Sequence, residues 1–312
     1  MSEIGIITNP HAKLNKRNPK RQKILSYIAG KQGVLKITND IKDLKLAAQE
    51  FYEQKISVLA INGGDGTISR TITAFIEVYG NKPLPRICIL PGGTINTLAK
   101  NLGISGGPEK NLYKLIESHR HGEKLDSVGL HTIQVEGYFG FLFANGICSN
   151  FLKEFYRKKT NVWGSIFLFL KTVISFIFRG KLFQRVVNCS NFRLLCEKEV
   201  NFKHKTCTIL CSTTPCLPLG VPFFDQLELH QDKFQCVSII SSLNNFVLRV
   251  VPKILLGFMK VHDQDKYSSC FKKLEIIGEK NFTYTVDGEL FESTKNKIEL
   301  SLGPKLNFIT NE

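Results

Sequence analysis

The chain has 312 residues, 43% of them hydrophobic, so it is long enough to bury one large core or two smaller ones. Its 42 lysine and arginine residues outnumber 27 acidic residues and give a formal net charge of +15, which favours anionic partners. The spacing of the nine cysteines suits neither a zinc ribbon nor a Cys-x-x-Cys redox pair, so we expect free thiols in a reducing compartment.

Strands and helices alternate in the first part of the sequence. Short apolar runs predict the strands, and the stretches between them have helical spacing. In chain order, the pattern predicts a strand at 4–7, a helix at 21–28, a strand at 34–37, a helix at 41–54, a strand at 56–61, a helix at 68–76 and a strand at 87–90. This alternation is typical of a parallel sheet covered on both faces, so residues 1–125 are expected to form an α/β domain.

The strand at 56–61 leads into the most informative string of the chain, Gly63-Gly64-Asp65-Gly66-Thr67. Its glycines let the backbone approach a ligand and adopt positive φ, and the N–H groups of such a turn before a helix can bind phosphate oxygens. A carboxylate among phosphates requires a metal ion to offset the repulsion. The alternative is a tight strand–helix turn capped by Asp65 or Thr67.

A second glycine turn, Gly92-Gly93, follows the strand at 87–90, with Thr94 or Asn96 available to cap the next helix. In a parallel sheet, ligands gather at the carboxyl ends of the strands, so both loops can face one cleft. Neither loop matches the P-loop or the Gly-x-Gly-x-x-Gly pattern. The prediction of a phosphate site therefore depends on the two loops together.

The pattern changes near Asp126, where short β-type runs replace the alternation. They predict strands at 130–135, 139–143, 185–187, 206–210, 227–229, 237–240, 274–277 and 282–286. Such runs predict a second domain, at 126–302, that is rich in antiparallel strands. Near its end, Val286-Asp287-Gly288-Glu289 would on its own form a good hairpin turn.

Two apolar segments accompany the basic charge. As a helix, segment 162–178 would be slightly shorter than the thickness of a bilayer core, and it carries Lys171 at its middle. The segment could form a buried helix or an interfacial helix, and a spanning helix is the less favoured alternative. Segment 246–259 contains Pro252 and predicts a surface or cleft helix. No nucleic-acid module accompanies the basic clusters, so an anionic membrane surface is the expected partner, with a merely dispersing basic surface as the alternative.

Taken together, these motifs resemble the diacylglycerol kinase family in the broad sense, which includes sphingosine and ceramide kinases and soluble bacterial lipid kinases. The resemblance rests on four blocks, in this order along nearly the whole chain: Thr8-Asn9-Pro10, residues 63–67, residues 91–96 and residues 286–289. The first glycine string is shared with NAD kinases, and the last two blocks narrow the match to lipid kinases. The resemblance implies an NAD-kinase-like α/β domain, a C-terminal β-sandwich with the active site in the cleft between them, and a return of residues 303–312 to the first domain.

The same resemblance implies ATP- and Mg²⁺-dependent transfer of the γ-phosphoryl group to the hydroxyl of diacylglycerol or a related lipid alcohol. Glu289 would take the proton from that hydroxyl, and Asp287 would orient Glu289 or hold the metal network. Asp65 would interact with the Mg²⁺–ATP phosphates. Asp225 weakly resembles a ligand of a structural Mg²⁺ site in bacterial members, although Gln226 stands where glycine is usual.

Further residues are expected around the nucleotide. Asn9 would lie beside it, and Asn96 would tie the second loop to the site. The remaining backbone and hydroxyl groups that the resemblance assigns to the phosphates belong to Gly63, Gly64, Gly66, Thr67, Gly92, Gly93 and Thr94. The resemblance also implies a peripheral membrane enzyme, and bacterial relatives are often homodimers. Residues 4–7 are too short an apolar core for a signal peptide, which favours a cytoplasmic location.

Several positions depart from the family pattern. Ser69-Arg70 and Thr97 replace an Asn-Glu pair and an Asp, and His11-Ala12-Lys13 stands where Ser-Gly is usual. The glycine loops and the expected base are retained, while the polar residues around them differ. Two alternatives therefore stay open: a non-catalytic lipid- or nucleotide-binding relative, and a soluble-metabolite kinase of the NAD type.

Overall fold

The computed structural model describes residues 3–157, 186, 190–196, 202–240 and 266–310. The apolar segments 162–178 and 246–259, and most of the predicted strand 185–187, lie outside these residues. Among the described helices, none combines the length and the apolar character needed to cross a membrane.

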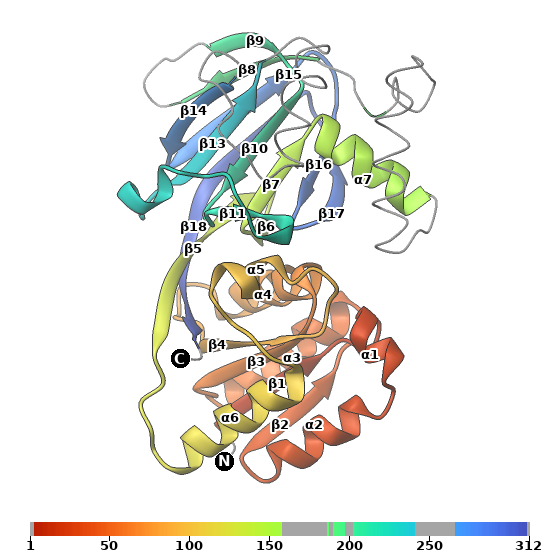
Figure 1. The fold of residues 1–312 in the computed structure, drawn as a ribbon, viewed down its shortest axis with the longest axis vertical. Helices are drawn as coiled ribbons and strands as arrows, with labels where there is room; N and C mark the ends of the chain where they lie inside the picture. Colours follow the sequence, from red (N-terminus) through yellow and green to blue (C-terminus); the bar gives the residue numbers. More distant parts are fainter. Residues whose placement is uncertain (1–2, 158–185, 187–189, 197–201, 241–265, 311–312) are drawn as a thin grey trace.

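The first domain is a parallel sheet with helices on both faces, as the alternating pattern predicts (Figure 1). Its strands lie in the order β2-β1-β3-β4, and all neighbours are parallel. The order of the chain reverses between β1 and β3, and in open α/β sheets ligands bind at the carboxyl ends of the strands at such a point. The elements are β1 (Ile4–Thr8), α1 (Lys13–Arg17), α2 (Arg21–Ala29), β2 (Gly33–Ile37), α3 (Ile41–Glu53), β3 (Val58–Gly63), α4 (Asp65–Tyr79), β4 (Arg86–Pro91), α5 (Thr97–Asn101) and α6 (Pro108–Arg120).

Successive residues of the central strands are buried in two different cores. Ile4 and Ile6 of β1 pack with Leu25 of α2 and with α6, whereas Ile7 belongs to the core formed with α3 and α4. Because side chains alternate across a strand and both faces are covered, each central strand is apolar throughout. This is why the apolar runs identified these strands so directly.

The second domain consists mainly of two sheets packed face to face. One is the six-stranded sheet β14-β13-β10-β7-β16-β17; the other is formed by β5, β6, β18, β15, β8 and β9. Phe143, Phe234, Ile276 and Leu300 are among the buried side chains between them. The elements are β5 (Ser127–Val135), β6 (Tyr138–Gly140), β7 (Leu142–Asn145), α7 (Ile147–Arg157), β8 (Ser190–Leu195), β9 (Phe202–Thr206), β10 (Thr208–Ser212), β11 (Cys216–Leu217), η1 (Pro218–Gly220), β12 (Val221–Pro222), η2 (Leu227–Leu229), β13 (Phe234–Ile239), β14 (Lys266–Phe271), β15 (Lys273–Gly278), β16 (Thr283–Val286), β17 (Glu289–Glu292) and β18 (Lys297–Ile309).

Two long strands, β5 and β18, run between the domains (Figure 1). They pair antiparallel along most of their length, with a shift in register between Leu302 and Lys305. Close to its end, β18 reaches the first domain, where Phe308 pairs with Ile87 of β4. A single sheet therefore continues from the parallel domain into the sandwich. The two domains consequently share a backbone hydrogen-bonded connection as well as side-chain contacts.

Several predicted elements differ from the observed ones. The predicted strand 227–229 is the 3₁₀ turn η2, and runs 139–143 and 206–210 each divide between two strands. The first division has a clear cause, since the N–H groups of Phe141 and Leu142 turn toward the carboxylate of Asp287. The second falls at Cys207, whose backbone N–H donates to Ile239 O and whose carbonyl accepts from Ile147 N. Helices α1, α6 and α7 have no counterpart in the sequence prediction.

The expectation that all cysteines are free thiols is wrong for one described residue, because Cys207 is disulfide-bonded. The other described cysteines, such as Cys88 and Cys211, are free. Sequence spacing could not reveal this bond, since a disulfide depends on the distance between Cα atoms in the fold.

Candidate active site

The two glycine loops pack directly against each other at the carboxyl ends of β3 and β4. A Cβ atom on Gly93 would lie 2.5 Å from the Cα of Gly64, and one on Gly92 would lie 3.2 Å from the backbone nitrogen of Gly63. A Cβ on Gly63 would overlap the side chain of Thr67 at 2.4 Å. Positive φ was expected for these glycines, but neither loop contains a glycine with positive φ. Their absence of a side chain serves close packing of the two loops.

Asp65, in the first glycine loop, caps helix α5, which follows the second loop. Its Oδ2 accepts from the backbone N–H of Thr97 at 3.0 Å, and its Oδ1 accepts from that of Leu98 at 3.1 Å. These N–H groups are the unsatisfied donors at the start of α5, where a carboxylate is also favoured by the helix dipole. Asp65 therefore fixes the second loop to the first, and it lies in the first turn of α4 without capping that helix.

Asn96 completes the second loop from within. It has a left-handed backbone, with φ of 51°, and its amide oxygen accepts from the N–H of Gly93 at 3.0 Å. Its amide nitrogen donates to the carbonyl of the same glycine at 3.3 Å. Thr94 is exposed at the tip of this loop. The structure thus places Asn96 as a brace of the loop and leaves the Thr94 side chain facing solvent.

Asn9 joins the end of β1 to the first glycine loop. Its side-chain nitrogen donates to Thr67 Oγ1 at 2.9 Å, and its backbone N–H donates to Asn62 O at 3.1 Å. Its amide oxygen accepts from His11 N at 2.8 Å. Asn9 and Thr67 were both predicted from the sequence, and the fold brings them into contact at the switch point between β1 and β3.

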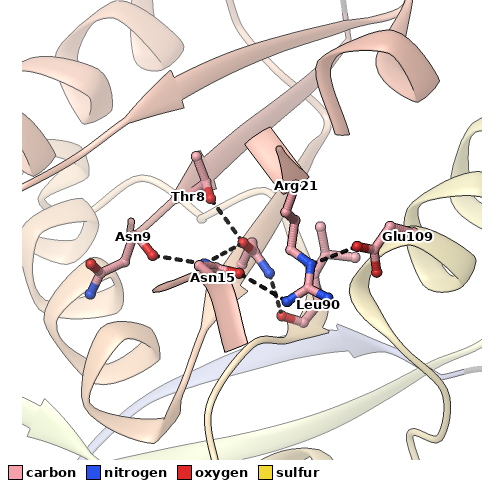
Figure 2. A network of polar contacts seen from close by, with 7 residues as sticks. Thr8, Asn9, Asn15, Arg21, Leu90 and Glu109 are labelled. Atoms are coloured by element: carbon pink, nitrogen blue, oxygen red, sulfur yellow. Dashed lines mark hydrogen bonds and ion pairs between the residues drawn. The ribbon is translucent and has the colours of Figure 1, made fainter. Parts of the chain in front are cut away.

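A buried polar network supports this contact from below (Figure 2). The amide oxygen of Asn62 accepts from Thr8 Oγ1 at 2.8 Å and from Asn15 Nδ2 at 2.7 Å, and Asn62 Nδ2 donates to Leu90 O at 3.2 Å. Asn15 Nδ2 also donates to Asn9 O at 2.7 Å. All polar atoms in this set have a partner, so the network stabilises one arrangement of the strand ends.

An ion pair between Arg21 and Glu109 extends the network to α2 and α6 (Figure 2). Arg21, at the start of α2, donates from Nε to Glu109 Oε1 at 2.6 Å, and its guanidinium lies 3.4 Å from Asn15 Oδ1. Both charged side chains are partly buried. The pair joins α2 to α6 beneath the loops, so it holds the surroundings of Asn15 in place.

The turn Asp287-Gly288 brings the second domain to this site. Asp287 and Gly288 have φ of 47° and 86°, and Val286 pairs with Glu289, which is the geometry of a type I′ hairpin. The hairpin expected from the sequence alone and the functional interpretation therefore coexist. Tyr156 of α7 donates from its hydroxyl to Gly288 O at 2.9 Å, which holds the turn from its other side.

The Asp287 carboxylate links three segments. It accepts from the N–H groups of Phe141 and Leu142, at 3.0 and 2.8 Å, and from the hydroxyl of Ser69 on α4. Burial, with a smaller contribution from the charge of Asp65, raises the pKa of Asp287 to about 7 against the opposing effect of the three hydrogen bonds. Near neutral pH, Asp287 is thus poised between its acid and carboxylate forms.

Glu289 lies over the first glycine loop. A Cβ atom on Gly66 would be 2.3 Å from Glu289 Oε1, so this carboxylate oxygen occupies the space that the missing side chain leaves. Glu289 Oε2 lies 2.5 Å from a terminal nitrogen of Arg70. The fold thereby joins the predicted base, at the end of the chain, to the loop that begins α4.

Asp225 is separate from this group. It follows the strand β12, is largely exposed, and its carboxylate accepts from Gln235 Nε2 at 3.0 Å and lies 4.0 Å from Lys266 Nζ. Both of these partners belong to the sandwich, on β13 and β14. Among the described residues, no set of three or more His, Cys, Asp and Glu side chains is arranged to hold a metal ion.

Sequence reasoning missed several residues of the site. Asn15 and Asn62 carry its polar contacts, yet each is a common residue type outside the recognised motifs. Ser69, which donates to Asp287, was noted only because it replaces the asparagine usual in the family. Arg70 attracted notice only as a departure from the family pattern. A signal was present for Asn62, because a polar residue at the end of a buried apolar strand calls for a hydrogen-bond partner.

Comparison with known proteins shows which sequences this chain resembles. Residues 3–127 match the family model described as "Diacylglycerol kinase catalytic domain". A protein of Staphylococcus epidermidis (strain ATCC 35984) named "Putative lipid kinase" is 30% identical over 100 residues, which are 32% of this chain and 31% of that protein. The chain thus aligns with about a third of the length of that curated relative. A protein of the same description from Streptococcus pneumoniae serotype 4 is 22% identical over 272 residues, covering 85% of this chain and 83% of its own.

Solved structures support the fold over the whole chain. Two structures from Bacillus anthracis, titled as a diacylglycerol kinase and a putative one, superpose with TM-scores of 0.68 and 0.71 at 14% and 17% identity. Each comparison covers 99% of this chain and 97% of the other. Like those structures, the chain combines a parallel α/β domain with an antiparallel β-rich one. Residues 3–127 are therefore similar to the catalytic domain of diacylglycerol kinases, and the fold of the chain resembles that of the two solved structures.

Proposed function

We propose that this protein is an ATP-dependent lipid kinase that transfers the γ-phosphoryl group of ATP to the hydroxyl of diacylglycerol or a related lipid alcohol. The observation that carries the proposal is the position of Glu289, whose Oε1 lies against Gly66 in the first glycine loop. A general base must come within hydrogen-bond reach of the proton it removes. Glu289 belongs to the second domain, and its carboxylate lies over a glycine loop of the first domain that is of the phosphate-binding type. This position meets that requirement.

In this reaction the lipid hydroxyl oxygen bonds to the γ-phosphorus as the bond from that phosphorus to the β–γ bridging oxygen breaks, and ADP leaves. Glu289 takes the hydroxyl proton. The N–H groups at the start of α4 would stabilise the developing charge on the phosphoryl oxygens. Asp287 holds the hairpin that presents Glu289, through its bonds to Ser69 and to the Phe141 N–H group.

The residues present fit a Mg²⁺ ion bound mainly by phosphate oxygens. Each oxygen of Asp65 accepts one backbone hydrogen bond and retains a further lone pair. Mg²⁺ in nucleotide sites takes one or two protein carboxylates and completes its shell with phosphates and water. Asp65 is therefore the proposed protein ligand, and the ion would neutralise charge on the transferring group.

A cytoplasmic location is part of the proposal, and the basic composition favours peripheral association with an anionic membrane, where the lipid substrate would reside. The same proposal includes a homodimer and no nucleic-acid partner. A catalytically inactive relative is the second candidate, because Arg70 already binds the expected base. The soluble-metabolite kinase remains as the third, and added NAD in the same assay tests it.

The test is transfer of labelled γ-phosphate from ATP with Mg²⁺ to a mixed lipid extract, resolved by lipid class, with Glu289→Gln beside the parent chain. We expect a labelled lipid whose formation falls by about 10²-fold or more in Glu289→Gln. Glu292→Gln is the matched control, since Glu292 lies on the same strand, pairs with Lys153 and is mostly exposed. No labelled lipid from the parent chain, or full activity of Glu289→Gln, would contradict the proposal.

A further inference from the structure

We propose that Arg70 is a positioning residue for the phosphoryl transfer, because it holds the Glu289 carboxylate in the orientation that presents Oε1 to the first glycine loop. The inference rests on the proposed function and adds to it a residue from the opposite domain. Arg70 lies on α4, whereas Glu289 begins β17. The two are 219 positions apart in the sequence, so their contact exists only in the assembled fold.

The two oxygens of the Glu289 carboxylate make different contacts. Oε2 lies 2.5 Å from the Arg70 guanidinium, and Oε1 lies over Gly66. Because the guanidinium is charged at any physiological pH, its bond to Oε2 is charge-assisted and strongly directional. A glutamate without this partner would populate several rotamers, only some of which direct an oxygen toward the loop.

Arg70 is itself held in place, which a positioning residue requires. Its neighbours on α4, Ile68 and Ile72, are buried in the core of the first domain. The hydroxyl of Tyr138 is buried beside its guanidinium, and Tyr156 anchors the turn before Glu289. Burial raises the pKa of Tyr138, so this phenol stays neutral beside the guanidinium.

Two simpler interpretations make different predictions. If the ion pair only fastens the domains together, its loss lowers stability and leaves kcat unchanged. Because Arg70 and Glu289 keep 47% and 28% of their side chains exposed, such a pair would contribute little to stability. If Arg70 instead withdraws the base, its loss increases kcat. A positioning role predicts a decrease in kcat without a matching change in KM for ATP.

The experiment measures kcat and KM of Arg70→Ala and Arg70→Lys with ATP and diacylglycerol in mixed micelles. We expect Arg70→Ala to lower kcat by about 10- to 100-fold, since small misplacements of a catalytic group reduce rates by this order. KM for ATP should stay within about twofold. Added methylguanidinium should restore part of the kcat of Arg70→Ala, and Arg70→Lys should retain more activity than Arg70→Ala.

Lys45→Met is the matched control. Lys45 forms an exposed ion pair with Glu77, which also lies on α4, and this pair is separate from the hairpin. Its loss should leave kcat and KM unchanged. An unchanged or higher kcat in Arg70→Ala, with an active parent chain, would overturn the positioning role alone. A parent chain that phosphorylates no lipid would overturn the proposed function, and the positioning role with it.

Discussion

Asp287 shows how much one residue contributes to this site. Its positive φ is tolerated because Asp adopts the left-handed region more readily than most residues, and Gly288 after it adopts it without strain. Its carboxylate simultaneously satisfies the N–H groups at the break between β6 and β7 and contacts Ser69 on α4. The residue therefore shapes the turn, satisfies the backbone where the chain passes from one sheet to the other, and joins two domains.

Stability should depend on pH through this residue. The pKa of Asp287 is raised from 3.8 to about 7 in the folded chain, so the folded state binds this proton more tightly than the unfolded state between those values. The free energy of unfolding should consequently fall as pH rises through that window and level off above it, by an amount on the order of a few kcal/mol. Urea unfolding of the parent chain and of Asp287→Asn at about pH 5 and about pH 8 measures this. An equal pH dependence in both proteins would contradict the assignment.

At the scale of elements, helix α5 depends on a partner outside itself. It has five residues, which is too short to be stable alone, and its N-cap residue Asn96 makes no capping bond with its side chain. Asp65 supplies the cap across the gap between the loops. The first glycine loop therefore stabilises the helix that follows the second one, and the two loops act as one structural unit.

Removing this cap should loosen α5 before it affects any other element. In Asp65→Ala the N–H groups of Thr97 and Leu98 lose their acceptor, which should reduce stability by about 1–2 kcal/mol and speed hydrogen exchange across residues 96–102. Asp65→Asn keeps one acceptor and should retain more protection. Unchanged exchange in Asp65→Ala would rule out the capping role. Comparing hydrogen exchange between Asp65→Ala and Asp65→Asn also tells whether a loss of activity comes from a loosened α5 or from the loss of a metal ligand.

At the scale of the whole molecule, contacts on several sides hold the two domains together. The hairpin at 286–289 contacts α4. Thr73 of α4 and Phe139 of β6 donate hydrogen bonds to each other, and β18 pairs with β4. On the other side of the loops, Asn101 of α5 donates to Cys216 O at 3.2 Å and accepts from Cys216 N at 2.9 Å. These contacts enclose the two glycine loops from the side of the sandwich.

The clamp between Asn101 and Cys216 should order the segment β11–η1–β12. Asn101→Ala removes both hydrogen bonds to Cys216 and also the bond from Asn101 Nδ2 to Thr97 O within α5. It leaves the Cys216 backbone groups without a side-chain partner, which should reduce stability by about 1–3 kcal/mol. Hydrogen exchange should increase in residues 216–222, and less so elsewhere. Asn39→Ala serves as the control, because Asn39 is exposed just before α3 and its hydrogen bonds are to Asp43 in the first turn of that helix. Equal protection of residues 216–222 in all three proteins would show that the clamp is unimportant.

Much of the first domain could be predicted because its physical signals are local. Strands such as 4–7 and 87–90 are apolar throughout, and the helices between them have helical spacing. Helix α6 was missed even though Pro108 stands at its first position, and α1 is too short for a periodic signal. In the second domain, strands of similar apolar character gave less certain limits, as η2 and the divided run 139–143 show.

The sequence by itself determined which residue types meet at the carboxyl ends of β3 and β4, because glycine-rich turns after buried strands are local features. Only the tertiary structure decided how they are used. Asp65 caps α5, Asn9 reaches Thr67, and Glu289 lies over Gly66 beside Arg70. Each of these contacts joins residues far apart in the chain, and such contacts depend on strand order and domain packing, which no local pattern of residues specifies.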